Sequence, residues 1–166
     1  SGEKDDIDAL AKAVFTLEGD KEAVAAILDE VKPLGNKIIR INSEDKVLYH
    51  GACVIASNYI TTLLYKSMKI FKDIGISENE AKEILEPLVK GAVENTFKKG
   101  PDKSLTGPIA RGDSDTVLKH LKDFNKYDDK TAKMYKIIAN ETLELASIEL
   151  LKDNMKINEL KLLLKD

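Results

Sequence analysis

The stretch that decides the fold is EDKVLYHGACVIASNYITTLLYKSMKIFKD, Glu44 to Asp73 of a 166-residue chain. Over most of its length, apolar residues occupy nearly the whole circumference of a helical wheel. A helix that is apolar nearly all round is buried on most of its sides. The stretch therefore predicts one long buried helix, with Ser43 as its N-cap and Gly75 just beyond its end.

A single polar stripe runs along this otherwise apolar helix. Lys46, His50, Cys53 and Ser57 recur at helical spacing and share one narrow face, with Thr61 close beside it. Polar groups that are buried without hydrogen-bond partners are costly. The stripe is therefore expected to face a partner, a cavity or a bound ligand.

Lys46 and His50 are the candidate catalytic residues of the stripe. Lys46 lies near the helix start, where the helix dipole disfavours a cation, and such lysines can donate a proton or hold a substrate oxygen. The alternative, which the pattern alone favours, is an exposed Lys46 paired with Glu44 or Asp45. His50 lies one turn later. Its alternative, a satisfied histidine in a helix-helix contact, is commoner than a catalytic one, and the position beside Lys46 supports the functional role.

The segment before the long helix has a different character. AVFTLEGD, residues 13–20, and NKIIRIN, residues 36–42, indicate two short strands on either side of a helix. Two short strands cannot form a stable sheet alone. We therefore expect residues 1–42 to be a remnant of a larger α/β sheet.

Everything after residue 42 is predicted to be helical. Ser77 and Glu80 form a capping box, Gly100 and Pro101 end that helix, and later caps begin further helices. The predicted fold class is mainly α, a helical bundle preceded by a small α/β remnant with two short strands.

Composition narrows the classes of partner. The formal net charge is −3, so the chain has no excess positive charge that would attract nucleic acid or an anionic membrane. Cys53 is the single cysteine, which favours a reducing compartment, and it is expected to be a small core residue. Ser57, Asn58, Thr61 and Thr62 interrupt the apolar run, so no stretch is expected to approach a transmembrane helix. We expect a cytoplasmic protein with no metal site, because the two histidines and the cysteine show no ligand spacing.

A second candidate region is SLTGPIARGD, Ser104 to Asp113. The chain has 26 basic residues, and only Arg40 and Arg111 are arginines. One interpretation is a turn, because Gly107 and Pro108 break the helical run. The other is that the planar guanidinium of Arg111 holds an anionic group of a substrate or cofactor, near the polar stripe of the same subunit or its dimer mate.

The motif EDKVLYHGACVIASNY, residues 44–59, together with SLTGPIARGD resembles the C-terminal half of a group of Rossmann-like NAD(P)-dependent oxidoreductases. The group includes pyrroline-5-carboxylate reductase, deazaflavin-dependent NADP oxidoreductases and the 6-phosphogluconate dehydrogenase-like C-terminal domains. FTLEGD, residues 15–20, is similar to the lead-in of this family, and the resemblance runs from about Phe15 to Ala146. It implies a parent enzyme that uses NADP or NAD through a nucleotide-binding half that is missing here.

The resemblance implies a division of the chain and a set of site residues. Residues 1–42 would be the end of a Rossmann-type domain, and residues 43–166 an all-helical domain that forms a homodimer and one wall of a substrate cleft. The substrate would be a small anionic metabolite with a C=O or C=N bond, and the isolated chain is expected to bind no cofactor and to be inactive. The implied roles are catalytic for Lys46 and His50, and substrate-binding for Ser57, Asn58, Gly107, Arg111 and Asp113.

The sequence leaves the substrate class and the function open. The lysine-then-asparagine spacing of the hydroxyacid dehydrogenases is not reproduced, because His50 stands one turn after Lys46. The alternative function is a non-catalytic helical dimerisation module, in which the apolar helix serves subunit contact and the polar stripe lies across a two-fold axis. A third possibility, a small regulatory helical binding domain, is supported by no specific feature.

Overall fold

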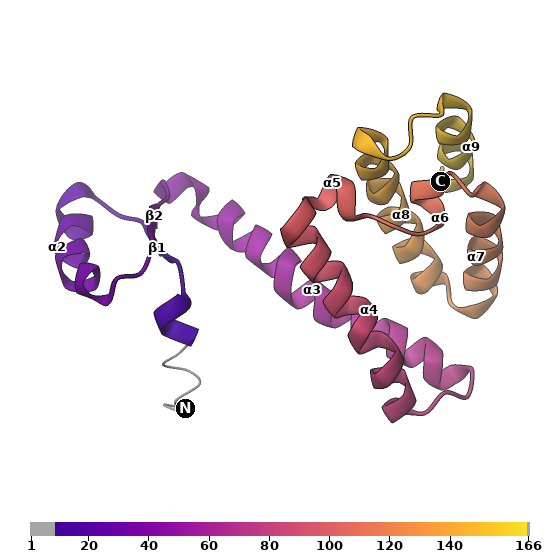
Figure 1. The fold of residues 1–166 in the computed structure, drawn as a ribbon, viewed down its shortest axis with the longest axis horizontal. Coiled ribbons are helices and arrows are strands. Elements are labelled where there is room, and N and C mark those ends of the chain that lie inside the picture. The colour runs from indigo at the N-terminus through magenta and orange to yellow at the C-terminus, as the bar shows by residue number, and fades with distance from the viewer. Residues whose placement is uncertain (1–8, 166) are drawn as a thin grey trace. The chain divides into compact units, whose positions relative to one another are not determined.

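The computed structural model describes residues 9–165 and is mainly α-helical, with two short strands before the long helices (Figure 1). This confirms the predicted fold class. The chain divides into two compact units, one ending at Leu63 and the other beginning at Leu64. The predicted division into residues 1–42, the end of a Rossmann-type domain, and residues 43–166, a helical domain, stays a prediction. The two predicted domains include residues 1–8 and 166, which lie outside the described residues.

The first unit contains both strands, as predicted. β1 (Phe15–Leu17) and β2 (Ile38–Arg40) pair in parallel, with Phe15 opposite Ile38. Helix α2 (Lys21–Val31) and a 3-10 turn (Lys32–Leu34) connect them. The side chain of Asp20 accepts a hydrogen bond from the backbone N–H of Ala23 at 2.8 Å, so a carboxylate occupies the N-terminus of α2.

The long helix α3 (Lys46–Asp73) follows a 3-10 turn (Ser43–Asp45). It begins two residues later than predicted, and Ser43 is the first residue of the 3-10 turn rather than the N-cap of α3. The expectation that this helix is buried was wrong, because none of its residues is buried and Cys53 is exposed. An apolar pattern shows that a helix can be covered, but it does not show that the same chain supplies the cover.

The length of α3 also corrects the expectation about membrane spans. The segment Ser43–Asp73 is long and apolar enough, by length and composition alone, to cross a membrane, with a mean hydropathy of 1.3 over its best window. Ser57, Thr61 and Thr62 lower this average less than charged residues would.

The second unit contains the helices that follow α3. Helix α4 (Glu78–Lys99) begins at the predicted capping box, in which the Ser77 N–H donates to Glu80 Oε2 at 2.9 Å. Two short helices, α5 (Pro101–Ser104) and α6 (Pro108–Arg111), stand where a turn was expected. The last three are α7 (Ser114–Tyr127), α8 (Asp129–Glu149) and α9 (Asn154–Leu164).

The core of the second unit lies among α6, α7, α8 and α9, which stand together in Figure 1. It is made of aliphatic side chains, with Leu105 and Tyr135 among the half-buried residues packed against it. Its buried members are Ile109, Val117, Leu121, Ala139, Leu143, Ala146, Leu151, Leu160 and Leu164. The short helix α6 contributes Ile109, so this part of SLTGPIARGD is a core element.

Candidate functional site

The first candidate site centres on an ion pair between a strand end and the start of α3. Glu18 directly follows β1, and its Oε2 lies 2.6 Å from the Nζ of Lys46. The Glu18 side chain is 23% exposed and that of Lys46 is 64% exposed. Lys46 therefore pairs across the unit, and not with its neighbours Glu44 or Asp45. This contact brings the carboxyl end of a parallel strand together with the polar stripe.

Two open cavities share Glu18 as part of their walls. One, of about 350 Å³, is lined by Thr16, Leu17, Glu18, Ile41, Lys46, Tyr49 and His50. The other, of about 360 Å³, lies over the carboxyl ends of β1 and β2 and the start of α2. Ligands of α/β proteins bind outside the carboxyl ends of parallel strands. The position of both cavities therefore suits a ligand site.

The first cavity contains both candidate catalytic residues. Lys46 and His50 lie one turn apart on α3 and line the same cavity, together with Tyr49. The hydroxyls of Thr16 and Tyr49 are 3.4 Å apart, which ties β1 to the same turn of α3. An ammonium, an imidazole and a phenol around one cavity can hold or protonate an oxygen or nitrogen atom of a ligand.

The charge of Glu18 depends on its two partners. The ammonium of Lys46, followed by the hydroxyl of Ser43, donates hydrogen bonds that hold the pKa of Glu18 below its ordinary value. Because folding lowers the pKa of Glu18, the ion pair stabilises the folded state at any pH above the ordinary pKa of a glutamate. This stabilisation is lost as the pH falls through the pKa that Glu18 has in the folded state. The ion pair is therefore intact at neutral pH.

Replacement of Lys46 by methionine is expected to raise the pKa of Glu18 towards the ordinary glutamate value. The charge-assisted hydrogen bond that favours the carboxylate would be lost, while the aliphatic stem would be kept. A ¹³C NMR titration of the Glu18 carboxyl measures this directly. Lys21→Met is the control: Lys21 lines the neighbouring cavity and makes no ion pair with Glu18, so the titration should not move. An unchanged midpoint in Lys46→Met would contradict the assignment.

Ser57 and Asn58 lie further along α3. The Ser57 hydroxyl donates to the carbonyl of Cys53 at 2.7 Å and lies 3.0 Å from the Asn58 side-chain oxygen. Neither residue lines the cavity of Lys46 and His50. Their predicted role in substrate binding stays a prediction.

Three of the predicted substrate-binding residues lie at or beside α6 in the second unit. Gly107 precedes α6, Arg111 is its last residue and Asp113 follows two residues later. Asp113 caps α7, because its carboxylate accepts from the backbone N–H of Thr116 at 3.0 Å and from its hydroxyl at 2.8 Å. These bonds lower the pKa of Asp113, with a smaller contribution from Arg111. The Arg111 guanidinium is 65% exposed and lies 3.9 Å from Asp113. Although Asp113 caps α7 and pairs weakly with Arg111, most of the Arg111 guanidinium stays exposed.

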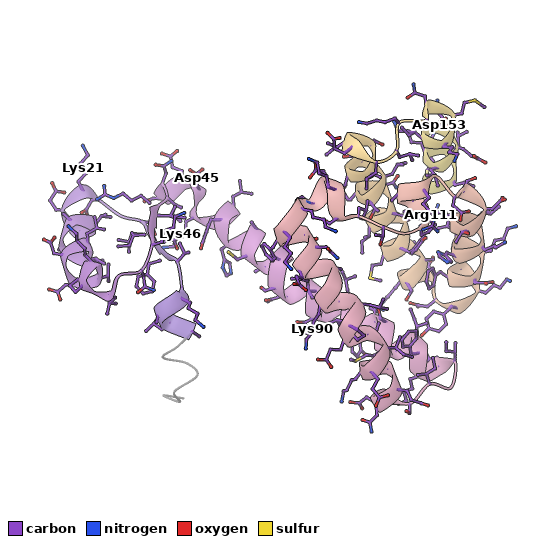
Figure 2. The ribbon with its side chains drawn as sticks, in the orientation of Figure 1. Lys21, Asp45, Lys46, Lys90, Arg111 and Asp153 are labelled. Carbon is purple, nitrogen blue, oxygen red and sulfur yellow. The ribbon has the colours of Figure 1, made fainter. Side chains whose placement is uncertain are left out.

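Figure 2 labels Lys46 at the start of α3 and Arg111 at the end of α6. The first belongs to the unit that ends at Leu63 and the second to the unit that begins at Leu64. The expectation that Arg111 lies near the polar stripe therefore stays a prediction.

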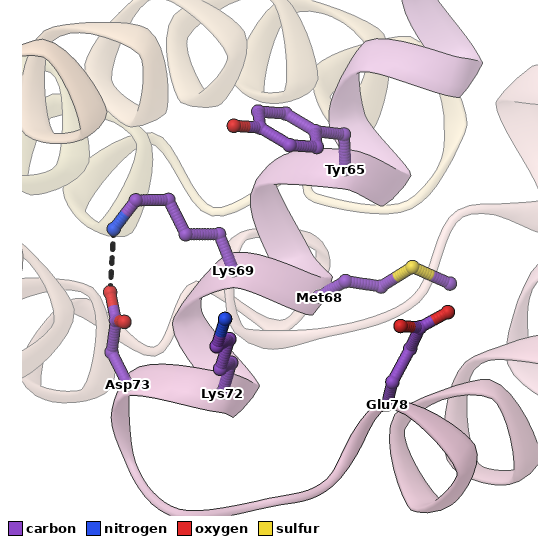
Figure 3. A pocket seen from close by; sticks show the side chains of 6 residues that line it. All are labelled: Tyr65, Met68, Lys69, Lys72, Asp73 and Glu78. Atoms are coloured by element: carbon purple, nitrogen blue, oxygen red, sulfur yellow. Dashed lines mark hydrogen bonds and ion pairs between the residues drawn. The ribbon is translucent and has the colours of Figure 1, made fainter.

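A further pocket, of about 460 Å³, lies in the second unit and is shown in Figure 3. Tyr65, Met68, Lys69, Lys72 and Asp73 of α3 line it, with Glu78 of α4. Lys69 Nζ lies 2.6 Å from Asp73 Oδ2 and donates to the Tyr127 hydroxyl at 3.2 Å.

The charges beside this pocket neutralise one another. Hydrogen bonds to Asp73 and then to Tyr127 raise the pKa of Lys69, and hydrogen bonds from Lys69 and then from Tyr127 lower the pKa of Asp73. Tyr127 also donates a hydrogen bond to Asp73, which ties the end of α7 to the end of α3. This cluster holds helices together, and the Glu18–Lys46 site remains the better candidate for ligand chemistry.

Sequence reasoning missed Glu18, which is the residue that organises the first site. Its signal was present in FTLEGD, where an acid directly follows a predicted strand. The pairing with Lys46 depends on a contact 28 positions away, which no local pattern reports. Among residues 9–165, no group of three or more His, Cys, Asp and Glu side chains is arranged to hold a metal ion.

Comparison with known proteins identifies relatives of this chain. A family described as a domain of unknown function (DUF2520) matches residues 13–142. The crystal structure of protein TM1727 from Thermotoga maritima is similar, with 31% sequence identity and a TM-score of 0.78. The match covers 89% of this chain and 59% of TM1727, so this chain spans about three fifths of that protein. No curated protein matches the chain.

Proposed function

The chain belongs to the DUF2520 family, and from that premise we propose that it is the C-terminal helical domain of an NAD(P)-dependent oxidoreductase. In this proposal the domain forms a homodimer in the cytoplasm and one wall of a substrate cleft. The substrate is a small anionic metabolite with a C=O or C=N bond, and neither a nucleic acid nor a membrane is a partner. The observation that carries the proposal is Lys46, held by Glu18 over a cavity at the carboxyl end of a parallel strand.

In this proposal the dinucleotide is not bound by residues 9–165. The strand-turn-helix from β1 to α2 has no glycine-rich phosphate loop, and the Asp20 carboxylate occupies the helix N-terminus where a pyrophosphate would lie. The proposal therefore assigns the binding of NADP or NAD to another part of the parent enzyme. The contribution of this chain is to bind and polarise the substrate.

The proposed roles follow from the groups around the cavity. Lys46 donates a hydrogen bond or a proton to the substrate oxygen or nitrogen, and His50 stands beside it on the same face. Glu18 keeps the ammonium in place. Arg111 binds the anionic group of the substrate, supported by its exposure and by the rigid α6 turn that carries it.

In the full-length parent enzyme, Lys46→Ala and Arg111→Ala are expected to reduce turnover by about 10²-fold or more while leaving the fold intact. General acid catalysis and bidentate anion binding contribute on this scale. The measurement is the oxidation of NADPH and NADH with a panel of small 2-oxo and imino acids, together with circular dichroism of each variant.

The matched control is Lys90→Ala. Lys90 lies on α4, is exposed and pairs with Glu86, so its loss should leave turnover unchanged. Wild-type activity in both Lys46→Ala and Arg111→Ala would overturn the assignment. A parent protein that oxidises neither nucleotide but remains dimeric would favour the dimerisation module, for which the exposed apolar α3 is the specific observation.

A further inference from the structure

A pocket of about 320 Å³ in the second unit is lined by the end of α3 and by residues around the start of α8. It shares Lys69 and Asp73 with the pocket of Figure 3. Its other charged residues are Lys66 of α3, Lys130 of α8 and the cap residue Asp128. Three lysines against two aspartates give it one excess positive charge. We call it the Lys66 pocket.

Both aspartates of the Lys66 pocket are engaged within the fold. The Oδ2 atom of Asp73 lies 2.6 Å from Lys69 Nζ. The Oδ2 atom of Asp128 accepts hydrogen bonds from the backbone N–H of Thr131 at 2.9 Å and from its hydroxyl at 2.6 Å. Lys69 and Asp73 therefore compensate each other, and Asp128 serves as the N-cap of α8.

Lys66 combines low exposure with a long ion pair. Its side chain is 27% exposed, the lowest value for any lysine in the ion pairs of residues 9–165. Its Nζ nevertheless lies 4.0 Å from Asp128 Oδ2, whereas the other lysine pairs are 3.1 Å or shorter. That oxygen is the one that Thr131 already uses. Because a cation withdrawn from water needs a close partner, the charge of Lys66 is incompletely compensated within the fold.

Lys130 is the second lysine of the pocket with capacity to spare. It is exposed, lies in the first turn of α8 and makes no ion pair with any of residues 9–165. Because Asp128 already caps α8, we assign the capacity to bind an anion to the ammonium groups of Lys66 and Lys130 and not to the helix end.

We propose that the Lys66 pocket binds the phosphoryl group of a small molecule, with Lys66 and Lys130 as its cationic ligands. Lysine binds phosphate as a point charge, and two uncommitted ammonium groups match the charge of about −1.5 to −2 on a phosphate monoester at neutral pH. The volume of about 320 Å³ is that of a small ligand pocket, so it accommodates the organic part as well. This inference does not rest on the proposed function, because the Lys66 pocket shares no residue with the cavity of Lys46 and His50.

Calorimetric titration of the full chain with inorganic phosphate and with glycerol 3-phosphate, at constant ionic strength, tests the pocket. We expect the wild-type chain to bind both. Lys130→Met and Lys66→Met should each raise the dissociation constant by about fivefold or more, because each removes a charge-assisted hydrogen bond to the phosphoryl oxygens. Tighter binding of glycerol 3-phosphate would identify a phosphorylated metabolite as the ligand, and equal binding would identify free phosphate.

Lys133→Met is the matched control. Lys133 lies on the same helix as Lys130, pairs with Asp129 and does not line the pocket, so its replacement removes the same charge and should leave the affinity unchanged. Circular dichroism reports whether each variant keeps its helices. Should Lys66→Met lose its helices, the exposed Lys130 decides the question, since its replacement removes no buried contact.

Three results would overturn the site. The first is a wild-type chain that binds neither phosphate nor glycerol 3-phosphate. The second is an unchanged dissociation constant in Lys130→Met. The third is equal weakening by Lys130→Met and Lys133→Met, which would mean that the anions respond only to the overall charge of the surface.

Discussion

Replacing Gly112 with alanine is expected to destabilise the second unit by about 2–5 kcal/mol. Gly112 has φ of 67° and ψ of 36°, a left-handed conformation that costs about 1–2 kcal/mol for other residues. An added Cβ would also lie 3.0 Å from Leu151 Cδ1 and 2.6 Å from Lys156 Cδ. The lysine stem can move, but Leu151 is buried, so overpacking adds about 1–3 kcal/mol.

Urea unfolding monitored by amide hydrogen exchange in α7 and α9 measures this loss. Gly91→Ala is the control, because Gly91 lies inside α4 with nothing within 4 Å of an added Cβ. That change should stabilise the helix by about 0.5–1 kcal/mol. A Gly112→Ala protein as stable as the wild type would contradict the close packing of Gly112 against Leu151 and Lys156.

Replacing Leu160 with alanine is expected to cost about 3–5 kcal/mol. Leu160 is completely buried and belongs to the core shared by α6, α7, α8 and α9. Truncation of a buried leucine loses its transfer free energy and leaves a cavity that the neighbours fill only in part. Thermal and urea unfolding of the same chain report the change.

Leu162, two residues further along α9, provides the matched comparison. It is 74% exposed, so Leu162→Ala should change the free energy of unfolding by about 0.5 kcal/mol or less. Equal losses for the two variants would mean that α9 does not dock on the core with the face that the structure assigns to it.

These two stability results bear on the candidate site through Arg111. The arginine lies between Ile109, which is buried in the core, and Gly112, which packs against α9. A loss of stability in Gly112→Ala would show that the backbone of α6, which carries Arg111, is held by this packing. Preorganised cations bind anions with less loss of conformational entropy.

The local parts of the fold follow from short-range patterns. The capping box at Ser77 and the two strands appear as predicted, because each depends on residues within one turn or on side-chain alternation. The polar stripe of α3 was also predictable, since helical spacing places Lys46 and His50 together and the structure puts both on one cavity.

Long-range contacts were not predictable in the same way. Glu18 was overlooked because its partner lies on another element. Leu160 and Leu162 are the same residue type on one apolar helix, and only the position of the neighbouring helices buries the first and exposes the second. The order of residues alone thus determined the strands, the longer helices to within a few residues, and which faces are apolar, since those depend on neighbours along the chain. Tertiary packing decided which apolar faces form the core and which carboxylate holds Lys46, because burial and ion pairing depend on atoms that distant segments bring together.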